Sequence, residues 1–293
     1  MFVVTGVTGH TGKVVAETLL AQGEKVRVVV RDAKQGEPWK ARGAEVAVAL
    51  LSDSAAMAAA LAGSKGAYLL IPPRYDANDM LAVQRPVVEA LAEAVRKSAI
   101  PHIVLLSSLG AELADGTGPI RILHHAERAL GAAAKHITFL RAAYFIENLA
   151  PVLGATAGGV LPTFLTPDRA IPMIATADIG RVAAELLLDP ATGTRVVELT
   201  SVRRWSPADV ARELSAVLGR AVTPQFAPDE AVVPALTSMG FLPGVAELFR
   251  EMTLGINDGR IGPQGGHVVR RFGQLSPIDV LKPLLAAGAP AHV

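Results

Sequence analysis

The chain of 293 residues contains no cysteine, which excludes disulfides, thiolate metal sites and a cysteine nucleophile. It also lacks an excess of either charge: 28 basic and 27 acidic residues leave a net charge of +1, which gives no sign of a nucleic-acid-binding surface. Although 51% of the residues are hydrophobic, no apolar run reaches the roughly 18–20 residues that a membrane span requires. The first residues read as a strand rather than a signal peptide. We therefore expect a folded cytosolic protein that contacts neither membranes nor nucleic acid directly.

Short apolar runs alternate with amphipathic helical patterns in the first half of the chain. Continuous apolar strands separated by helices predict an α/β fold whose parallel sheet is covered on both faces. His102 and His136 precede two of these strands and are expected at the surface. The strand-like runs are residues 2–5, 25–30, 45–48, 67–71, 102–107 and 136–140, and the helical patterns cover 12–22, 52–61 and 81–96.

The texture of the sequence changes after about residue 150, where proline and glycine interrupt short segments. This predicts two units: a larger domain over residues 1–150, and a smaller α+β lobe over residues 151–293. In this prediction, some segments beyond residue 150 could still belong to the structure of the first unit. Two helices are expected in the smaller lobe, over 179–188 and 207–218, with Asp178 and Ser206 as N-cap residues.

A glycine-rich turn, TGVTGHTG at residues 5–12, follows the first predicted strand and opens the first predicted helix. The free N–H groups and the positive dipole end of such a helix form an anion site. The glycines permit the tight turn, the approach of a pyrophosphate and the packing of helix on strand. Strand, turn and helix together predict a Rossmann-type doubly wound sheet that binds a dinucleotide. The candidate cofactor-binding residues here are Gly6, Thr8, Gly9, His10, Thr11 and Gly12.

The second strand ends in Arg31, 19 residues after Gly12. In proteins that prefer NAD, an acidic side chain at about this position accepts hydrogen bonds from the ribose 2′-hydroxyl. A guanidinium instead pairs with a 2′-phosphate. Arg31 therefore favours NADP(H) over NAD(H). The alternative is an arginine at a strand end that is solvated and paired with Asp32.

Three further motifs accompany the glycine turn: Ile71-Pro72-Pro73 and Ser107-Ser108 after two strands, and the segment LRAAYFIEN at residues 140–148. Together these motifs resemble the NmrA-like family of atypical short-chain dehydrogenases/reductases. The resemblance implies that residues 1–150 form an NAD(P)-binding Rossmann domain and that residues 151–293 form a small substrate-binding lobe over the nicotinamide end. The family includes quinone and azo-dye reductases as well as regulators without catalysis. Ile71, Pro72, Pro73 and Ser107 join the candidate cofactor-binding residues.

One position departs from the family pattern. Leu50 follows the third strand where related proteins usually place an aspartate that faces the adenine. A hydrogen bond from that side chain to the adenine is therefore lost. The nearby Asp53 is better placed as the N-cap of the next helix.

Residues for proton transfer are scarce, because the chain has only three tyrosines. Short-chain dehydrogenases use a tyrosine and a lysine four residues apart, but the residues four beyond the three tyrosines are proline, aspartate and asparagine. His124 is a candidate proton donor on the predicted helix 120–128, although the alternative is that one of His124 and His125 is packed and the other solvated. Tyr144 is a second candidate catalytic residue, expected at the wall of the nicotinamide pocket, or it simply packs between the lobes. No histidine spacing indicates a metal site.

These observations favour an NADPH-dependent reductase that delivers hydride to a small molecule such as a quinone or an azo compound. Such acceptors take their proton from water and need no tyrosine-lysine pair. The alternative is a non-catalytic NADP(H)-binding redox sensor that acts through protein partners. Sugar epimerisation or dehydration is disfavoured, because those reactions also rely on the missing pair. Assembly as a homodimer is left open.

Overall fold

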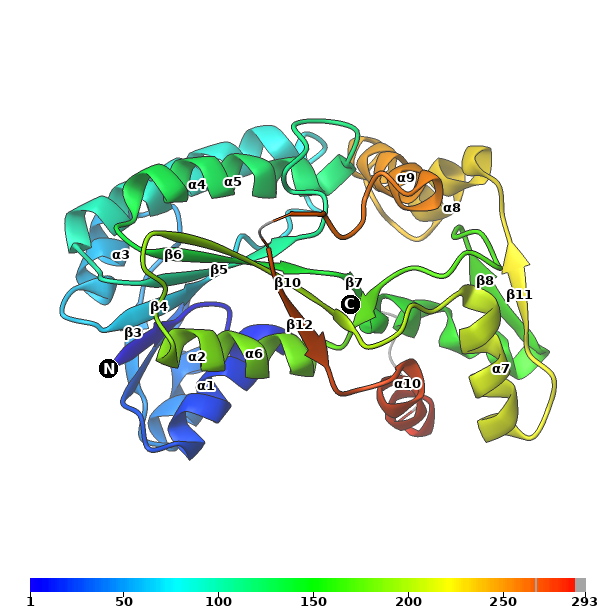
Figure 1. Cartoon of the computed structure of the whole chain (residues 1–293), viewed down its shortest axis with the longest axis horizontal. Helices are drawn as coiled ribbons and strands as arrows, with labels where there is room; N and C mark the ends of the chain where they lie inside the picture. The colour runs from blue at the N-terminus through cyan, green and yellow to red at the C-terminus, as the bar shows by residue number, and fades with distance from the viewer. Residues whose placement is uncertain (267, 288–293) are drawn as a thin grey trace.

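One large parallel sheet organises the molecule, as the computed structural model of residues 1–266 and 268–287 shows (Figure 1). Its strands are β1 (Phe2–Val4), β2 (Val26–Val30), β3 (Glu45–Val48), β4 (Gly66–Leu69), β5 (Ile103–Ser108), β6 (Ile137–Ala142), β10 (Thr194–Ser201) and β12 (Val269–Gly273). Their order across the sheet is β12-β10-β6-β5-β4-β1-β2-β3, with every neighbouring pair parallel. The doubly wound α/β fold predicted from the sequence is confirmed.

Helices cover both faces of this sheet (Figure 1). On one face lie α1 (His10–Ala21), α2 (Ala33–Lys40) and α6 (Thr176–Leu188), and on the other lie α3 (Ser54–Leu61), α4 (Met80–Ser98) and α5 (Arg121–Ala133). The sequence pattern did not indicate α2, which contains Pro38 and buries only Gly36 and Trp39. Asp53 caps α3 as predicted, since its carboxylate accepts the N–H groups of Ala55 (3.1 Å) and Ala56 (3.0 Å).

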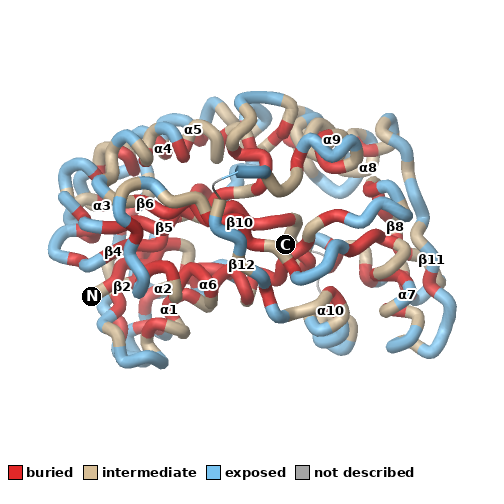
Figure 2. The backbone as a smooth tube through the Cα atoms, in the orientation of Figure 1, coloured by how far each residue is buried: buried red, intermediate tan, exposed pale blue. Residues whose placement is uncertain are grey.

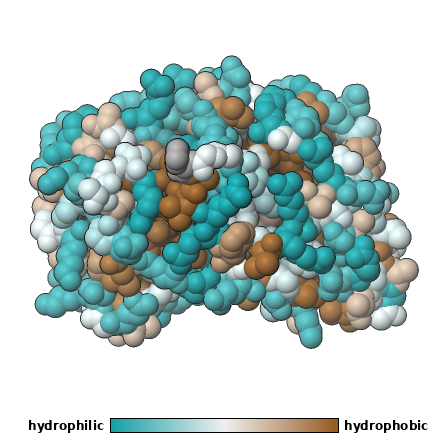
Figure 3. Space-filling model, in the orientation of Figure 1, coloured by the Kyte–Doolittle hydropathy of each residue, from teal (hydrophilic) through white to brown (hydrophobic). Residues whose placement is uncertain are grey.

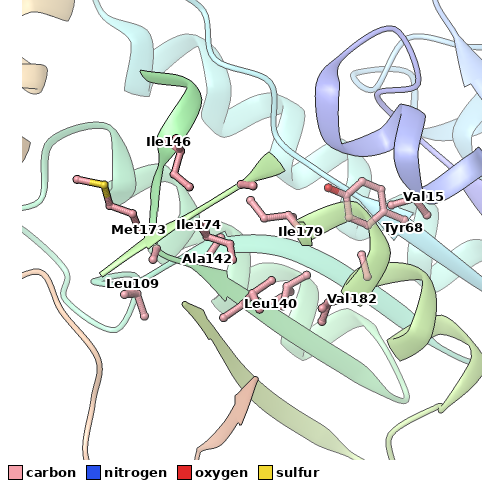
Figure 4. Packing of buried hydrophobic residues seen from close by; sticks show 14 of the residues in the cluster. Val15, Tyr68, Leu109, Leu140, Ala142, Ile146, Met173, Ile174, Ile179 and Val182 are labelled. Carbon is pink, nitrogen blue, oxygen red and sulfur yellow. The ribbon is translucent and has the colours of Figure 1, made fainter. Parts of the chain in front are cut away.

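Two hydrophobic cores form because successive side chains of a strand point to opposite faces of the sheet. Val4 and Val28 contribute to the core under α1 and α6, whereas Val3 and Val29 contribute to the core under α3 and α4. Burial is accordingly concentrated in the strands and on the inner sides of the helices (Figure 2). In the first core, Tyr68 of β4 lies among aliphatic side chains from the sheet and its helices (Figure 4).

The chain beyond residue 150 builds a smaller lobe and also completes the large sheet. The lobe holds β8 (Val160–Thr163), α7 (Pro207–Leu218), β11 (Thr223–Phe226), α8 (Val232–Ser238), α9 (Pro243–Asp258) and α10 (Pro277–Ala286), while β7 (Tyr144–Phe145) pairs with β9 (Met173–Ile174). Strands β10 and β12 return to the sheet and pair with β6 and with each other. A boundary at residue 150 therefore does not coincide with the edge of the large sheet, because β10, β12 and the covering helix α6 all lie beyond it in the chain.

The two N-caps predicted in this half of the chain have different outcomes. Ser206 caps α7 in a capping box with Asp209, as expected. Asp178 is not an N-cap, because α6 begins at Thr176, two residues earlier. Its carboxylate instead accepts the backbone N–H groups of Gln274 and Leu275, both at 2.9 Å. Asp178 thereby joins α6 to the segment between β12 and α10.

The surface matches the modest charge of the sequence. Hydrophilic residues dominate the face seen in Figure 3, and apolar residues appear there in separate patches. Exposed apolar side chains include Val269 and Phe272 on the edge strand β12, with 47% and 53% of their surface accessible. Within residues 1–266 and 268–287, no helix combines the length and the apolar character needed to cross a membrane.

His102 contradicts its predicted surface position, because only 1% of the residue is exposed. Its Nε2 lies 3.3 Å from the hydroxyl of Thr138 on β6. Burial, with smaller effects of the charges on Arg195 and His136, lowers the pKa of His102 to about 4. The folded protein therefore holds this imidazole neutral, whereas an unfolded chain protonates it near pH 6.5.

This difference predicts a loss of stability in mild acid. Because the folded-state pKa is depressed, the unfolded chain binds more protons between pH 6.5 and 4, and the free energy of unfolding falls as the pH drops through that window. We expect His102 to contribute a loss of about 2 kcal/mol by pH 5. Urea unfolding of wild type and His102→Gln at pH 7.5 and pH 5 checks this. An equal pH dependence of the two proteins would contradict it.

Candidate functional site: a cavity at the carboxyl edge of the sheet

A cavity of about 490 Å³ lies at the carboxyl ends of the central strands. It is lined by residues that directly follow β1, β4, β5 and β6, together with residues of the smaller lobe. The strand order runs from β1 to β3 in one direction and from β4 to β6 in the other. Open α/β sheets bind ligands at such a reversal of strand order. The lining includes these residues predicted to bind a cofactor: Gly6, Thr8, Gly9, His10, Thr11, Ile71, Pro72, Pro73 and Ser107.

The glycine turn has the geometry that a pyrophosphate requires. Gly6 adopts φ +68°, which favours glycine. A Cβ on Gly12 would lie 2.4 Å from the Thr5 carbonyl oxygen, so Gly12 permits close packing of helix on strand and does not itself line the cavity. A Cβ on Gly9 would meet only the Gly6 oxygen, at 3.5 Å, which leaves the space above it open. No side chain caps α1, so its first N–H groups are free to bind an anion.

A buried tyrosine on β4 forms a hydrogen bond to the end of this turn. The Tyr68 hydroxyl on β4 donates a hydrogen bond of 2.9 Å to the Thr11 hydroxyl. Burial raises the pKa of Tyr68, so its proton stays in this bond at neutral pH. Thr11 lines the cavity, and its orientation is therefore fixed by the sheet and not by solvent.

Arg31 lies exposed at the end of β2 and outside the lining of the cavity. Asp32 does not pair with it among the ion pairs of the described residues, and instead caps α2 by accepting the Lys34 N–H at 2.9 Å. Leu50 after β3 is 54% exposed. The guanidinium of Arg31 is thus available to a ligand that extends past the turn toward β2.

A buried charged network stands behind the wall formed by β5 and β6. Arg141 of β6 makes two bonds to Glu127 of α5, Nε to Oε1 at 2.9 Å and Nη2 to Oε2 at 2.6 Å. The Ser107 hydroxyl donates to Glu127 Oε1 at 2.6 Å. Ser107 has only one hydroxyl proton, so it faces the cavity as a hydrogen-bond acceptor. Arg141 also donates to Glu112 (3.0 Å) and Gln264 (2.9 Å).

The network pairs Arg141 with Glu127 away from water. The side chains of Arg141 and Glu127 are 7% and 8% exposed. Burial alone would lower the pKa of Arg141, but the hydrogen bonds and charge of Glu127, with the charges of Glu112 and Glu198, raise it above its usual value. Sequence reasoning missed this network, because its members lie on three elements (β5, α5 and β6) and two loops and form no motif.

Tyr144 lines the cavity, as the sequence predicted. Burial raises its pKa to about 12, against a smaller opposing effect of its hydrogen bond with the Asn148 side chain. The tyrosine of a short-chain dehydrogenase needs a shift in the other direction to exchange its proton. Tyr144 therefore stays protonated at neutral pH and is suited to donate a hydrogen bond, not to act as an acid or base.

His124 and His125 both lie outside the lining of the cavity. A ring nitrogen of His124, Nδ1, donates to the Ala111 carbonyl oxygen at 2.9 Å and so ties α5 to the loop after β5. His125 points to Glu89 of α4, with Nε2 2.8 Å from its carboxylate. The geometry gives the proposed proton-donor role of His124 no support, and a structural role accounts for both residues.

The far wall of the cavity comes from the smaller lobe. Tyr75, after β4, forms an aromatic group with Phe241 and Phe249, whose ring centroids are 5.5–5.8 Å apart. Tyr75 and Phe249 line the cavity beside Met252, Ile256 and Ile261. The wall is apolar and aromatic, as a flat, weakly polar ligand requires. Among the residues that the structure describes, no group of His, Asp and Glu could hold a metal ion.

The comparisons with known proteins agree with this geometry. An NAD(P)H azoreductase of Xenophilus azovorans is 27% identical over 254 residues, which cover 86% of either chain. Quinone oxidoreductase 2 of Escherichia coli (strain K12) is 25% identical over 88% of this chain and 89% of its own. The solved structure of an NADPH-dependent quinone oxidoreductase from E. coli with NADPH superposes with a TM-score of 0.79, at 25% identity over 90% of this chain and 91% of that one. The model of the NmrA-like family matches residues 1–274, and the chain belongs to that family.

Proposed function

We propose that the protein is an NADPH-dependent reductase that transfers hydride to a quinone or azo compound. The observation that carries this proposal is the cavity itself, which joins an anion-binding glycine turn to an apolar aromatic wall. Relatives named as an azoreductase and a quinone oxidoreductase support it. The cavity lining contains no lysine, and its Tyr144 has a raised pKa, so the acceptor must be one that needs little acid from the protein.

The residues of the site divide the work between binding and orientation. The N–H groups of the turn bind the pyrophosphate, and Ser107 accepts a hydrogen bond from the nicotinamide half of the cofactor. NADPH supplies a hydride when bound. A quinone that receives this hydride takes one proton from water and becomes a hydroquinone. The wall around Phe249 holds the acceptor ring flat.

Turnover with a panel of acceptors tests the proposal. We expect NADPH oxidation in the presence of naphthoquinones or azo dyes to exceed the rate without protein. Phe249→Ala should raise the KM for the acceptor while the Kd for NADPH stays unchanged, because Phe249 belongs to the far wall. Tight NADPH binding with no turnover across the panel would overturn the proposal and favour a redox sensor.

The preference for NADP(H) is proposed from Arg31. We expect Arg31→Asp to weaken NADPH binding by about 10- to 100-fold, since a charge-assisted pair with the 2′-phosphate is replaced by repulsion. NADH binding should stay within about twofold. Titrations of both cofactors by fluorescence measure this, with Arg96→Asp as the control, because Arg96 is an exposed arginine in the last turn of α4. An unchanged preference would remove Arg31 from the site.

A further inference from the structure

Glu147 is the one carboxylate among the described residues that line the cavity, and that lining contains neither lysine nor arginine. It lies five residues beyond the end of β6, in the first turn of the 3-10 segment Ile146–Gly158. The carboxylates of Glu127 and Glu112, in contrast, both form ion pairs with Arg141. No cation of the described residues pairs with Glu147, so its charge acts on whatever occupies the cavity.

The Glu147 side chain is held in place by the start of α6. Its Oε1 accepts hydrogen bonds from the backbone N–H of Thr176 (2.9 Å) and from the Thr176 hydroxyl (2.6 Å). Its Oε2 is shielded from solvent and has no hydrogen-bond partner. The helix dipole offsets part of the charge, but water does not screen the rest.

The direction of the bound dinucleotide follows from the fold. The turn after β1 fixes the pyrophosphate, and Arg31 at the end of β2 marks the adenosine half. The nicotinamide half therefore extends the other way, across the ends of β4, β5 and β6, toward Ser107 and Glu147. The nicotinamide ring gains a positive charge when it gives up a hydride, and a nearby unscreened carboxylate stabilises that charge.

We propose that Glu147 makes the reaction end of the cavity electronegative, which favours the oxidised cofactor over the reduced one and disfavours anionic acceptors. This inference rests on the proposed function and adds to it a class of acceptor: neutral or cationic aromatic compounds, as opposed to sulfonated or carboxylated ones. The charge acts as an electrostatic element and exchanges no proton.

Equilibrium binding constants measure the effect of the Glu147 charge on each form of the cofactor. Glu147→Gln keeps an oxygen that accepts from Thr176 but removes the charge. We expect its Kd for NADP⁺ to rise about tenfold and its Kd for NADPH to change less than twofold. For this two-electron couple, a tenfold rise in the ratio of the Kd for NADP⁺ to the Kd for NADPH raises the reduction potential of the bound cofactor by about 30 mV. The Kd for 2′,5′-ADP, which has no nicotinamide, should be unchanged, as should all three constants in the surface control Glu89→Gln.

A matched pair of quinones, one neutral and one anionic, tests whether Glu147 disfavours anionic acceptors. We expect the wild type to favour 1,4-naphthoquinone over 1,4-naphthoquinone-2-sulfonate in kcat/KM, and Glu147→Gln to reduce that preference by about tenfold. Comparing the two proteins cancels the intrinsic difference in reactivity between the quinones. A merely structural role for Glu147 would change both acceptors by the same factor.

The outcomes separate this inference from the proposed function. If Glu147→Gln weakens NADP⁺ and NADPH equally, or leaves both unchanged, with a wild-type melting temperature, the electrostatic role is overturned and the reductase stands. If the variant melts early, Glu147→Asp, which retains the charge, must keep the wild-type ratio of the two constants. If the wild type binds neither NADPH nor 2′,5′-ADP, the proposed function falls as well.

Discussion

Arg141→Met is expected to lower the free energy of unfolding by about 3–5 kcal/mol, because it leaves the buried Glu127 carboxylate without a counter-ion. Both side chains lie behind the wall of the cavity, where water cannot replace the lost partner. The Ser107 hydroxyl, which donates to the same carboxylate oxygen, should also lose its fixed orientation. Urea unfolding followed by circular dichroism measures the loss.

Two control variants show whether the loss of stability comes from the unpaired charge. The double variant Arg141→Met with Glu127→Leu also removes the more deeply buried carboxylate and should be more stable than Arg141→Met alone, since only Glu112, whose side chain is 19% exposed, then lacks its partner. Arg42→Met breaks an exposed pair with Glu17 and should cost less than about 1 kcal/mol. A loss below about 1 kcal/mol in Arg141→Met would show that water or another cation reaches Glu127.

Gly12→Ala is expected to weaken NADPH binding at least about 100-fold and to lower the free energy of unfolding by about 2–3 kcal/mol. The new Cβ would lie 2.4 Å from the Thr5 oxygen and 2.5 Å from the Gly6 oxygen, both backbone atoms. The turn and the start of α1 must therefore move apart. Their N–H groups would then no longer converge on one anion. Isothermal titration and thermal melting measure the two effects.

Gly9→Ala provides the contrast. Its Cβ meets only the Gly6 oxygen, at 3.5 Å, and its backbone is extended, so stability should change by less than about 1 kcal/mol. Binding of NADPH should still fall, because the methyl group occupies the space that a pyrophosphate needs. Gly154→Ala, with nothing within 4 Å of the added atom, is the control for both. Equal losses of stability in the three variants would contradict the assigned roles of Gly9 and Gly12.

The sequence predicted which segments after the strands come together at the cavity, because that arrangement depends on local order. A strand, a glycine turn and a helix are neighbours in the chain, and parallel strands bring their following residues to one edge. The position of Pro72, Ser107 and Tyr144 along the cavity follows from that rule. Arg31 follows β2 but lies outside the lining of the cavity, and its contact with a cofactor stays a prediction.

The remaining features depend on contacts between distant segments, which no local pattern encodes. Tyr75 meets Phe249 across more than 170 positions of the chain, and Arg141 meets Gln264 across 123. His102 precedes a strand and so reads as a surface residue, yet the strands beside it bury it. The adjacent histidines on α5 suggested chemistry, but only the structure shows that His124 bonds to Ala111.

The order of the walls along the chain has a consequence for synthesis on the ribosome. The turn and the residues after β4 and β5 that line the cavity all lie within the first 109 positions, whereas Phe249, Met252 and Ile261 emerge about 140 residues later. The strand β12 at the edge of the sheet follows them. A nascent chain therefore completes the glycine turn and its neighbouring strands well before the aromatic wall that closes the cavity has been made.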